Sequence, residues 1–193
     1  MILKNKEKYE GIFEDDYLKN GNIKFQNGNI IDFVIKEKKE GKRILKYNNG
    51  DEYNGDWINN KKERKGIMKY LNGDEYNGDW KEDLRNGFGK MKYNNGKVYE
   101  GYWNKNVMEG EGIMQYPNYD VYIGNWINGV RIGNGKMIYS NGDNYEGNWN
   151  YNIREGKGKI NYINVNKFNG VWVNVIIIYG NIEYLNGDIY FGN

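Results

Sequence analysis

A repeat of 23 residues runs through most of this chain and dominates its folding options. The segment NNGDEYNGDW runs from Asn48 to Trp57, and LNGDEYNGDW runs from Leu71 to Trp80. An aromatic anchor recurs every 23 residues, followed by Gly after two residues and Trp after four, and these positions hold all 6 tryptophans. The anchors are Tyr53, Tyr76, Tyr99, Tyr122, Tyr145 and Phe168. Such a period is typical of repeat arrays.

Each repeat has a second half-motif in front of its anchor, as in GFGKMKYNNG from Gly87 to Gly96. The whole unit reads G-x-G-x-x-x-Y-x-N-G-x-x-Y-x-G-x-W. Both halves alternate with a period of two, and Asn-Gly separates them. This pattern predicts two short strands in a β-hairpin, and no helices.

The loop between the two halves decides which side chains share a face. A two-residue turn at 95–96 would put the two aromatic sets on opposite faces, whereas an odd number of loop residues puts them on one face. Two loops remain open on sequence. One has three residues, 94–96, with Gly in the left-handed region. The other has five, 94–98, and would place Gly89 opposite Trp103.

The stretches GFGKMKYNNGKVYEGYW and GNGKMIYSNGDNYEGNW resemble the MORN repeat (membrane occupation and recognition nexus). The resemblance implies an all-β fold: an elongated array of β-hairpin repeats, as a twisted single sheet or solenoid-like rod. Nine units of two strands would span roughly 80 Å. We predict degenerate N-terminal hairpin repeats in 1–40, regular repeats in 41–172, and a degenerate, truncated C-terminal repeat in 173–193.

Several positions depart from the pattern, and we expect distorted units there. Arg64 replaces the first Gly of its pair, and Phe33 replaces the Gly that follows an anchor position. The pairs Asn118-Tyr119 and Asn164-Val165 replace Asn-Gly. Weak copies at the N-terminal end begin at Tyr9 and Ile31.

The composition removes most catalytic chemistry. The 193 residues include no Cys and no His, and also no Thr and a single Ser, Ser140. Thiolate, imidazole and Cys- or His-ligated metal chemistry is therefore excluded, and hydroxyl nucleophiles nearly so. We predict that the protein is not an enzyme, with no catalytic, cofactor-binding or metal-binding residues and no cofactor.

Charge and hydropathy favour a protein of the cytoplasm, peripheral to membranes or to the cytoskeleton. Lys and Arg number 28 against 26 Asp and Glu, a net charge of +2 that does not indicate a nucleic-acid partner. The N-terminal stretch MILKNKEKYEGIF becomes charged at its fourth residue, unlike a signal peptide. No later window has the length of apolar sequence that a membrane span needs.

Side chains that imitate functional sites have simpler interpretations. A tyrosine used in every repeat favours packing over a ligand cage. The Gly-x-Gly pairs precede no helix and are interpreted as close-packing positions. Two carboxylate groups near the turns lack the spacing of a calcium site or a glycosidase pair, which favours turn hydrogen bonding. They are Asp51, Glu52 and Asp56, then Asp74, Glu75 and Asp79.

Two basic stretches, Lys36–Arg43 and Lys61–Lys65, could contact anionic lipid at about 1 kcal/mol per cation. Acidic residues dilute both, which favours ordinary solvated connectors. The apolar run Val175–Tyr179 replaces a polar loop, and the chain stops at Asn193, before a Trp completes the unit. The run predicts either a homodimer through the C-terminal repeats or an extra-stable terminal packing layer.

Together these features predict a non-catalytic scaffold or adaptor that binds protein partners and anionic phospholipid membrane surfaces, with no nucleic acid. Two alternatives remain. One is an aromatic-repeat module that binds choline or a glycan through its rings. The other is a regulatory module that binds a separate enzyme.

Overall fold

All regular structure in the described part of the chain is antiparallel β-sheet, which confirms the predicted array of hairpins. The computed structural model describes residues 8–14, 17–24, 30–34, 41–163 and 167–192, with side chains described from residue 41 onward. No helix occurs among these residues. The chain divides into two compact units, residues 1–94 and 95–193.

Unit 1 has eight strands within its described residues, and each pairs with the next along the chain. They are β1 (Lys8–Glu14), β2 (Tyr17–Lys24), β3 (Ile30–Val34), β4 (Gly41–Lys46), β5 (Glu52–Ile58), β6 (Lys61–Lys69), β7 (Glu75–Lys81) and β8 (Leu84–Lys92). Such neighbour-to-neighbour pairing follows from short hairpin connections.

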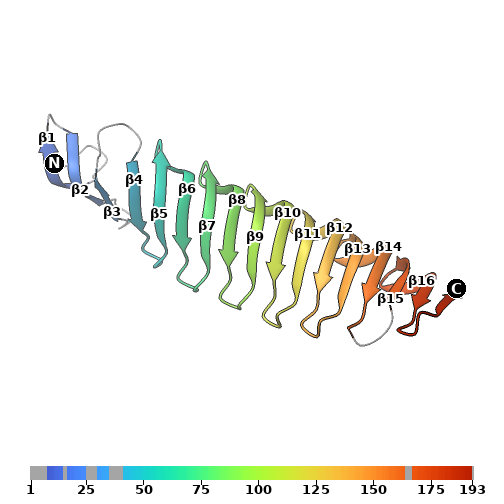
Figure 1. The fold of residues 1–193 in the computed structure, drawn as a ribbon. Helices are drawn as coiled ribbons and strands as arrows, with labels where there is room; N and C mark the ends of the chain where they lie inside the picture. The colour runs from blue at the N-terminus through green and yellow to red at the C-terminus, as the bar shows by residue number, and fades with distance from the viewer. Residues whose placement is uncertain (1–7, 15–16, 25–29, 35–40, 164–166, 193) are drawn as a thin grey trace. The chain divides into compact units, whose positions relative to one another are not determined.

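Unit 2 has nine strands within its described residues, again paired in chain order, and Figure 1 shows them side by side. They are β9 (Val98–Asn104), β10 (Val107–Gln115), β11 (Val121–Ile127), β12 (Val130–Ile138), β13 (Asn144–Asn150), β14 (Ile153–Asn161), β15 (Lys167–Val173), β16 (Ile176–Glu183) and β17 (Ile189–Gly192).

The strand register carries the repeat into unit 1 as far as β1. Tyr9 pairs with Ile23, which pairs with Ile31, and the column continues through Leu45 to the anchor Tyr53. The weak copies at Tyr9 and Ile31 therefore occupy the same column as the regular anchors. The three segments predicted from repeat quality, 1–40, 41–172 and 173–193, differ from the two compact units and stay a prediction.

In five repeats of the described chain, the first connection is the three-residue loop. At 116–120, the Tyr116 N–H donates to the Asp120 carbonyl and the Tyr119 N–H donates to the Tyr116 carbonyl, both at 2.9 Å. Tyr119 has a φ of 68°, the left-handed value that closes this loop. The same pair of bonds forms in the loops at 47–51, 70–74, 139–143 and 184–188.

The register that a five-residue loop would produce is wrong in these copies. Gly112 lies opposite Gly124 and Gly110 lies opposite Trp126, so the second Gly of the pair faces another Gly rather than Trp. The shorter loop forms because a left-handed third residue lets both strands begin pairing at once.

The second connection is a two-residue turn with positive φ at both positions, as at Asn59 (49°) and Asn60 (63°). These values are those of a type I′ turn, which matches strand twist and favours Asn and Gly. Val175 occupies the second position of the last such turn with a φ of 64°, an unusual conformation for a β-branched residue.

The first Gly of each Gly-x-Gly pair lies in a bulge that needs a left-handed residue. Gly110 has a φ of 81° and Gly133 a φ of 68°. Arg64 adopts a φ of 56° at this position, and Gly55 still pairs with Gly66. The distortion expected at Arg64 and at Tyr119 is therefore absent, since each residue takes the glycine conformation. Val165 and the side chain of Phe33 lie outside the described residues.

The shortening of the last repeat lies in the bulge of β16. Trp149 pairs with Arg154 and Gly147 with Gly158, whereas Trp172 pairs with Ile177 and Gly170 with Gly180. The bulge of β16 thus contains one residue fewer than that of β14. This deletion explains the shorter spacing at the C-terminal end, because pairing resumes in the same register on both sides of it.

Replacement of Arg64 tests the cost of the left-handed bulge. We expect Arg64→Gly to be about 1 kcal/mol more stable than Arg64→Ala, because only Gly adopts a positive φ without a Cβ penalty. Both variants remove the same Arg side chain, so the comparison isolates the backbone. Urea unfolding followed by Trp fluorescence measures the difference. Equal stabilities would show that the bulge carries no strain.

Replacement of Gly66 tests the close approach of backbone and ring. A Cβ at Gly66 would collide with the hydroxyl and ring of Tyr53. We expect Gly66→Ala to lose about 2–3 kcal/mol of unfolding free energy, as overpacked cores do. The matched control is Gly41→Ala in the same unit, where no atom lies within 4 Å of the added Cβ. A similar loss in both variants would contradict the packing account.

Candidate functional site

The anchor tyrosine of each regular repeat is completely buried against bare backbone. Tyr122 is 0% exposed, and its ring lies over Gly124 and Gly135, which face each other in the register. A Cβ on Gly124 would lie 2.6 Å from the Tyr122 hydroxyl and 2.7 Å from the Gly135 Cα. The hydroxyl donates to the Asn125 carbonyl at 3.2 Å. Glycine is therefore required on both strands under the ring.

Within each unit, tryptophans link neighbouring repeats, as Trp80, Trp126, Trp149 and Trp172 show. Trp126 contacts Tyr122 and Tyr99 in T-shaped geometry, with ring centroids 5.2 and 5.5 Å apart. Its indole N–H donates to the Gly112 carbonyl at 3.4 Å. In unit 1, Tyr53 lies 5.3 Å from two tryptophans in the same way. Such pairs add about 0.5–1.5 kcal/mol each to the area that they bury, so the core continues from repeat to repeat.

Cations cover the outer side of this aromatic layer. The Cζ of Arg131 lies 4.5 Å from the ring centroid of Trp149 and 5.4 Å from that of Tyr122. These distances are in the range where an aromatic ring attracts a guanidinium. Arg154 has the same placement one repeat later. We call these stacked cations the cation row of their unit: Lys62 and Arg85 in unit 1, and Arg131 and Arg154 in unit 2.

Sequence reasoning missed the cation row, although a signal for it exists. Every member follows a repeat tryptophan by five residues, as Arg131 follows Trp126. Met108 occupies the same position after Trp103, since Met108 pairs with Trp103 as Arg131 pairs with Trp126. A Lys or Arg that recurs five residues after the repeat tryptophan is the sequence pattern that could have revealed the cation row.

A second set of tyrosines borders the cation row and is only half-buried. Tyr47 is an example: Lys62 Nζ lies 5.9 Å from its ring centroid, and burial, with Asp83 and Asp51 adding to it, raises its pKa to about 12. The end member Tyr162 is 42% exposed. The others are Tyr70, Tyr93, Tyr116 and Tyr139. Sequence reasoning assigned both tyrosine positions to packing, but the structure separates a buried set from an accessible one.

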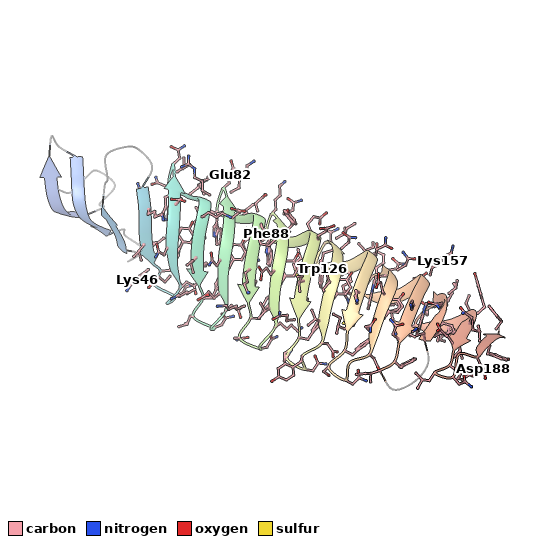
Figure 2. All side chains as sticks on the ribbon, in the orientation of Figure 1. Lys46, Glu82, Phe88, Trp126, Lys157 and Asp188 are labelled. Carbon is pink, nitrogen blue, oxygen red and sulfur yellow. The ribbon has the colours of Figure 1, made fainter. Side chains whose placement is uncertain are left out.

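We use the term aromatic face for the side of each unit that carries both tyrosine sets, the tryptophans and the cation row. The opposite face carries cross-strand ion pairs together with exposed apolar side chains such as Ile113 and Ile123. Lys92 Nζ lies 3.2 Å from Glu75 Oε1, and Lys136 Nζ lies 3.9 Å from Glu146 Oε2. Figure 2 shows side chains projecting from the strands from β4 onward.

The two groups of carboxylates near the turns have structural partners. Asp51 accepts the Leu71 N–H at 2.9 Å, which ties one loop to the next, and Asp74 accepts the Asn94 N–H at 2.8 Å. Asp79 lies 2.6 Å from Lys65 Nζ and accepts the Phe88 N–H at 2.9 Å. Asp56 accepts the Lys65 N–H at 3.4 Å. Glu52 and Glu75 form cross-strand ion pairs with Lys46 and Lys92.

The basic stretch Lys61–Lys65 does not form one patch, because alternate residues of a strand point to opposite faces. Lys62 stacks over the Trp80 ring at 4.7 Å, whereas Lys65 forms an ion pair with Asp79 on the other face. Most of the second stretch, 36–40, lies outside the described residues. Arg43 lies in β4 opposite Gly55, where other repeats have Gly.

The apolar run at 175–179 is exposed. Ile176 is 65% exposed, Ile178 44% and Tyr179 52%. It therefore does not form the buried terminal packing layer that was one of the two interpretations. In the described residues, no group of three or more acidic side chains is arranged to hold a metal ion. The same residues contain no helix suited to crossing a membrane.

The spacing of the buried tyrosines, glycines and tryptophans matches a known repeat family. MORN repeats match residues 53–75, 76–98, 99–121, 122–144 and 145–164, together more than half of the chain. The chain belongs to the MORN repeat family. The resemblance inferred from the sequence is thus confirmed over these five MORN repeats. No curated protein is significantly similar to this MORN array in sequence.

Solved structures with the same fold include TCP domains. The wild-type TCP10 domain of Danio rerio CPAP has a TM-score of 0.59 and 9% identity, covering 98% of this chain and 90% of that one. The SAS-4 (dCPAP) TCP domain of Drosophila melanogaster was solved in complex with a proline-rich motif of Ana2 (dSTIL). It has a TM-score of 0.52 and 12% sequence identity, and the match covers 96% of this chain and 97% of that one. The Danio rerio TCP10 domain with a STIL peptide has a TM-score of 0.57 and 12% sequence identity, and the match covers 95% of this chain and 81% of that one.

Alkaline pH should unfold the array through its buried tyrosines. Burial raises the pKa of Tyr122 and Tyr145 to about 12, above the value of about 10 in an unfolded chain. Because the folded-state pKa is the higher one, this contribution to stability is complete below about pH 10. It is lost as the pH rises toward 12, at about 1.4 kcal/mol per pH unit for each tyrosine.

Urea unfolding between pH 8 and about 11.5, followed by Trp fluorescence, measures this dependence. Tyr122→Phe should make the slope shallower, since one titrating group is gone. Tyr119→Phe is the matched control, because it removes a tyrosine hydroxyl from a side chain that is 85% exposed. A slope that is the same in all three proteins would contradict the prediction.

Proposed function

We propose that this MORN array is a non-catalytic scaffold whose aromatic face binds extended segments of partner proteins. The observation that carries the proposal is the regular alternation of half-buried tyrosines with the cation row. Tyr116, Tyr139 and Tyr162 recur at the same spacing as Arg131 and Arg154. Rings with a polar tip and guanidinium groups are the side chains most enriched where proteins bind each other.

The fold comparison supports this proposal. The SAS-4 TCP domain and the Danio rerio TCP10 domain, which share the fold, were solved with a proline-rich motif and a STIL peptide respectively. A sheet whose strands continue in chain order offers a peptide many equivalent positions. Repeat arrays in general use such continuous surfaces for partner binding.

The packing of the rings argues against the choline or glycan alternative. An aromatic cage for a quaternary ammonium needs open ring faces. Trp126 is 3% exposed and Tyr122 is 0% exposed, and Arg131 already lies over Tyr122. The protein's own cations therefore take the position that a ligand cation would need.

Other parts of the sequence-based hypothesis remain proposals. A regulatory module that binds a separate enzyme is one form of the scaffold role. Association with anionic phospholipid surfaces loses the support of Lys61–Lys65, since Lys62 and Lys65 belong to different faces. A place in the cytoplasm, peripheral to membranes or to the cytoskeleton, fits a scaffold of this kind.

Selection from a random peptide library displayed on phage tests the scaffold role. We expect enriched peptides that bind the full chain and cross-link to a photoreactive aromatic residue at position 162. Position 102 is the matched control, because Tyr102 is 51% exposed and Tyr162 is 42% exposed, on opposite faces of unit 2. Failure to enrich any peptide would reject the proposal, and cross-linking at 102 alone would place binding on the wrong face.

Self-association through the C-terminal repeats is a second role favoured by exposed apolar side chains. Ile176, Ile178 and Phe191 are 65%, 44% and 75% exposed, and gathered apolar surface of this kind usually marks an interface. Sedimentation should show dimers at high concentration that Ile176→Lys with Ile178→Lys abolishes. Ile113→Lys, on the opposite face of β10, is the control. A monomer at every concentration would exclude this role.

A further inference from the structure

The cation row of unit 2 sets a spacing for whatever binds along it. Arg131 lies in β12 and Arg154 in β14, at equivalent register positions opposite Trp126 and Trp149. Neighbouring strands lie about 4.8 Å apart, so the two guanidinium groups are separated by about 9.6 Å across the strands. A ligand that meets both must present its anionic groups at this interval.

The two arginines have hydrogen-bonding capacity left for a ligand. Within residues 41–163 and 167–192, neither Arg131 nor Arg154 forms an ion pair. The Nε and Nη2 of Arg131 donate to Asn152 at 3.2 and 3.0 Å, which leaves its second terminal nitrogen. Stacking on tryptophan uses the flat side of a guanidinium and leaves its edge for a carboxylate.

The spacing distinguishes among peptide conformations. A polyproline II helix has three residues per turn and rises about 3.1 Å per residue, so side chains of one side recur every 9.3 Å. An extended strand presents one side at intervals of about 6.6 or 13.2 Å, because its side chains alternate. Of these two extended conformations, only polyproline II matches the distance between the arginines.

The tyrosines beside the cation row suit the same conformation. Tyr116 and Tyr139 are half-buried, and Tyr162 is 42% exposed. Each repeat therefore offers one partly exposed aromatic ring beside the cation row. Proline-rich segments generally bind to surfaces lined with aromatic side chains, because the preformed polyproline II helix loses little entropy on binding.

We propose that the partner segment is an acidic proline-rich peptide in the polyproline II conformation, with Asp or Glu at every third position, lying across the strands of unit 2. This inference rests on the proposed function and specifies its ligand. Each carboxylate meets one arginine of the cation row, and the prolines between them lie on the tyrosines. Met108 occupies the preceding position of the row in unit 2, opposite Trp103, so the acidic contacts begin at Arg131.

Synthetic peptides of equal composition test the spacing. PPEPPEPPEPPE places Glu at every third position, whereas PEPEPPPPEPEP contains the same residues with other intervals. Measured by fluorescence anisotropy with the full chain, the first should bind at least about 10-fold more tightly, the value of one charge-assisted hydrogen bond. Equal affinities would overturn the proposal, as would equal binding of PPQPPQPPQPPQ.

Variants of the protein test the residues. Arg131→Gln and Arg154→Gln should each weaken binding of the regular peptide about 10-fold, while Lys136→Gln on the opposite face should not. Met108→Arg should tighten it, because the row gains a third cation at the same interval. This gain does not depend on a destabilising change, so it keeps the test valid if a Gln variant folds poorly. No gain and no loss would overturn the proposal.

The two proposals fail in different ways. If phage selection enriches peptides that cross-link at position 162 but lack acidic residues at every third position, the scaffold role stands and the polyproline II ligand is wrong. If selection enriches nothing and PPEPPEPPEPPE does not bind, both are wrong.

Discussion

The structure depends on a tyrosine ring resting on two facing glycines. At Tyr122 the ring covers Gly124 and Gly135, and no side chain could be added to either without a collision. A single sheet has no second layer to bury its apolar face, so the rings themselves must form that layer. Bare backbone beneath them lets the rings lie close enough to exclude water, and the hydroxyl is satisfied by a nearby carbonyl.

This contact explains why the strand register is preserved from repeat to repeat. Tryptophans stand edge-on between successive tyrosines at 5.1–5.5 Å, so any change of register would break two contacts at once. The loops and bulges tolerate more sequence variation than the ring positions do. Tyr119 replaces Gly, and β16 lacks one bulge residue, yet pairing resumes in register after both. The array thus preserves the ring positions and absorbs variation at bulges and turns.

The same geometry creates the surface assigned to partners. Once the anchor rings are buried, the outermost groups on the aromatic face are the half-buried tyrosines and the cations stacked on tryptophan. Arg131 is held at 4.5 Å over Trp149 and needs no carboxylate of its own unit to be placed there. A regular scaffold therefore presents a regular set of guanidinium edges, which is why the spacing of a ligand can be inferred from the spacing of strands.

The sequence by itself determined the family, the hairpins, the single aromatic face and the absence of His and Cys chemistry, because each follows from periodicity or composition. It left the loop length open and missed the cation row. The tertiary structure decided the three-residue loop, the left-handed Arg64 and the difference between the buried Tyr122 and the half-buried Tyr116. The loop depends on the backbone hydrogen bonds that close it. The burial of Tyr122 depends on contacts across strands with Gly135 and Trp149, and periodicity shows that a motif recurs but not which neighbours meet.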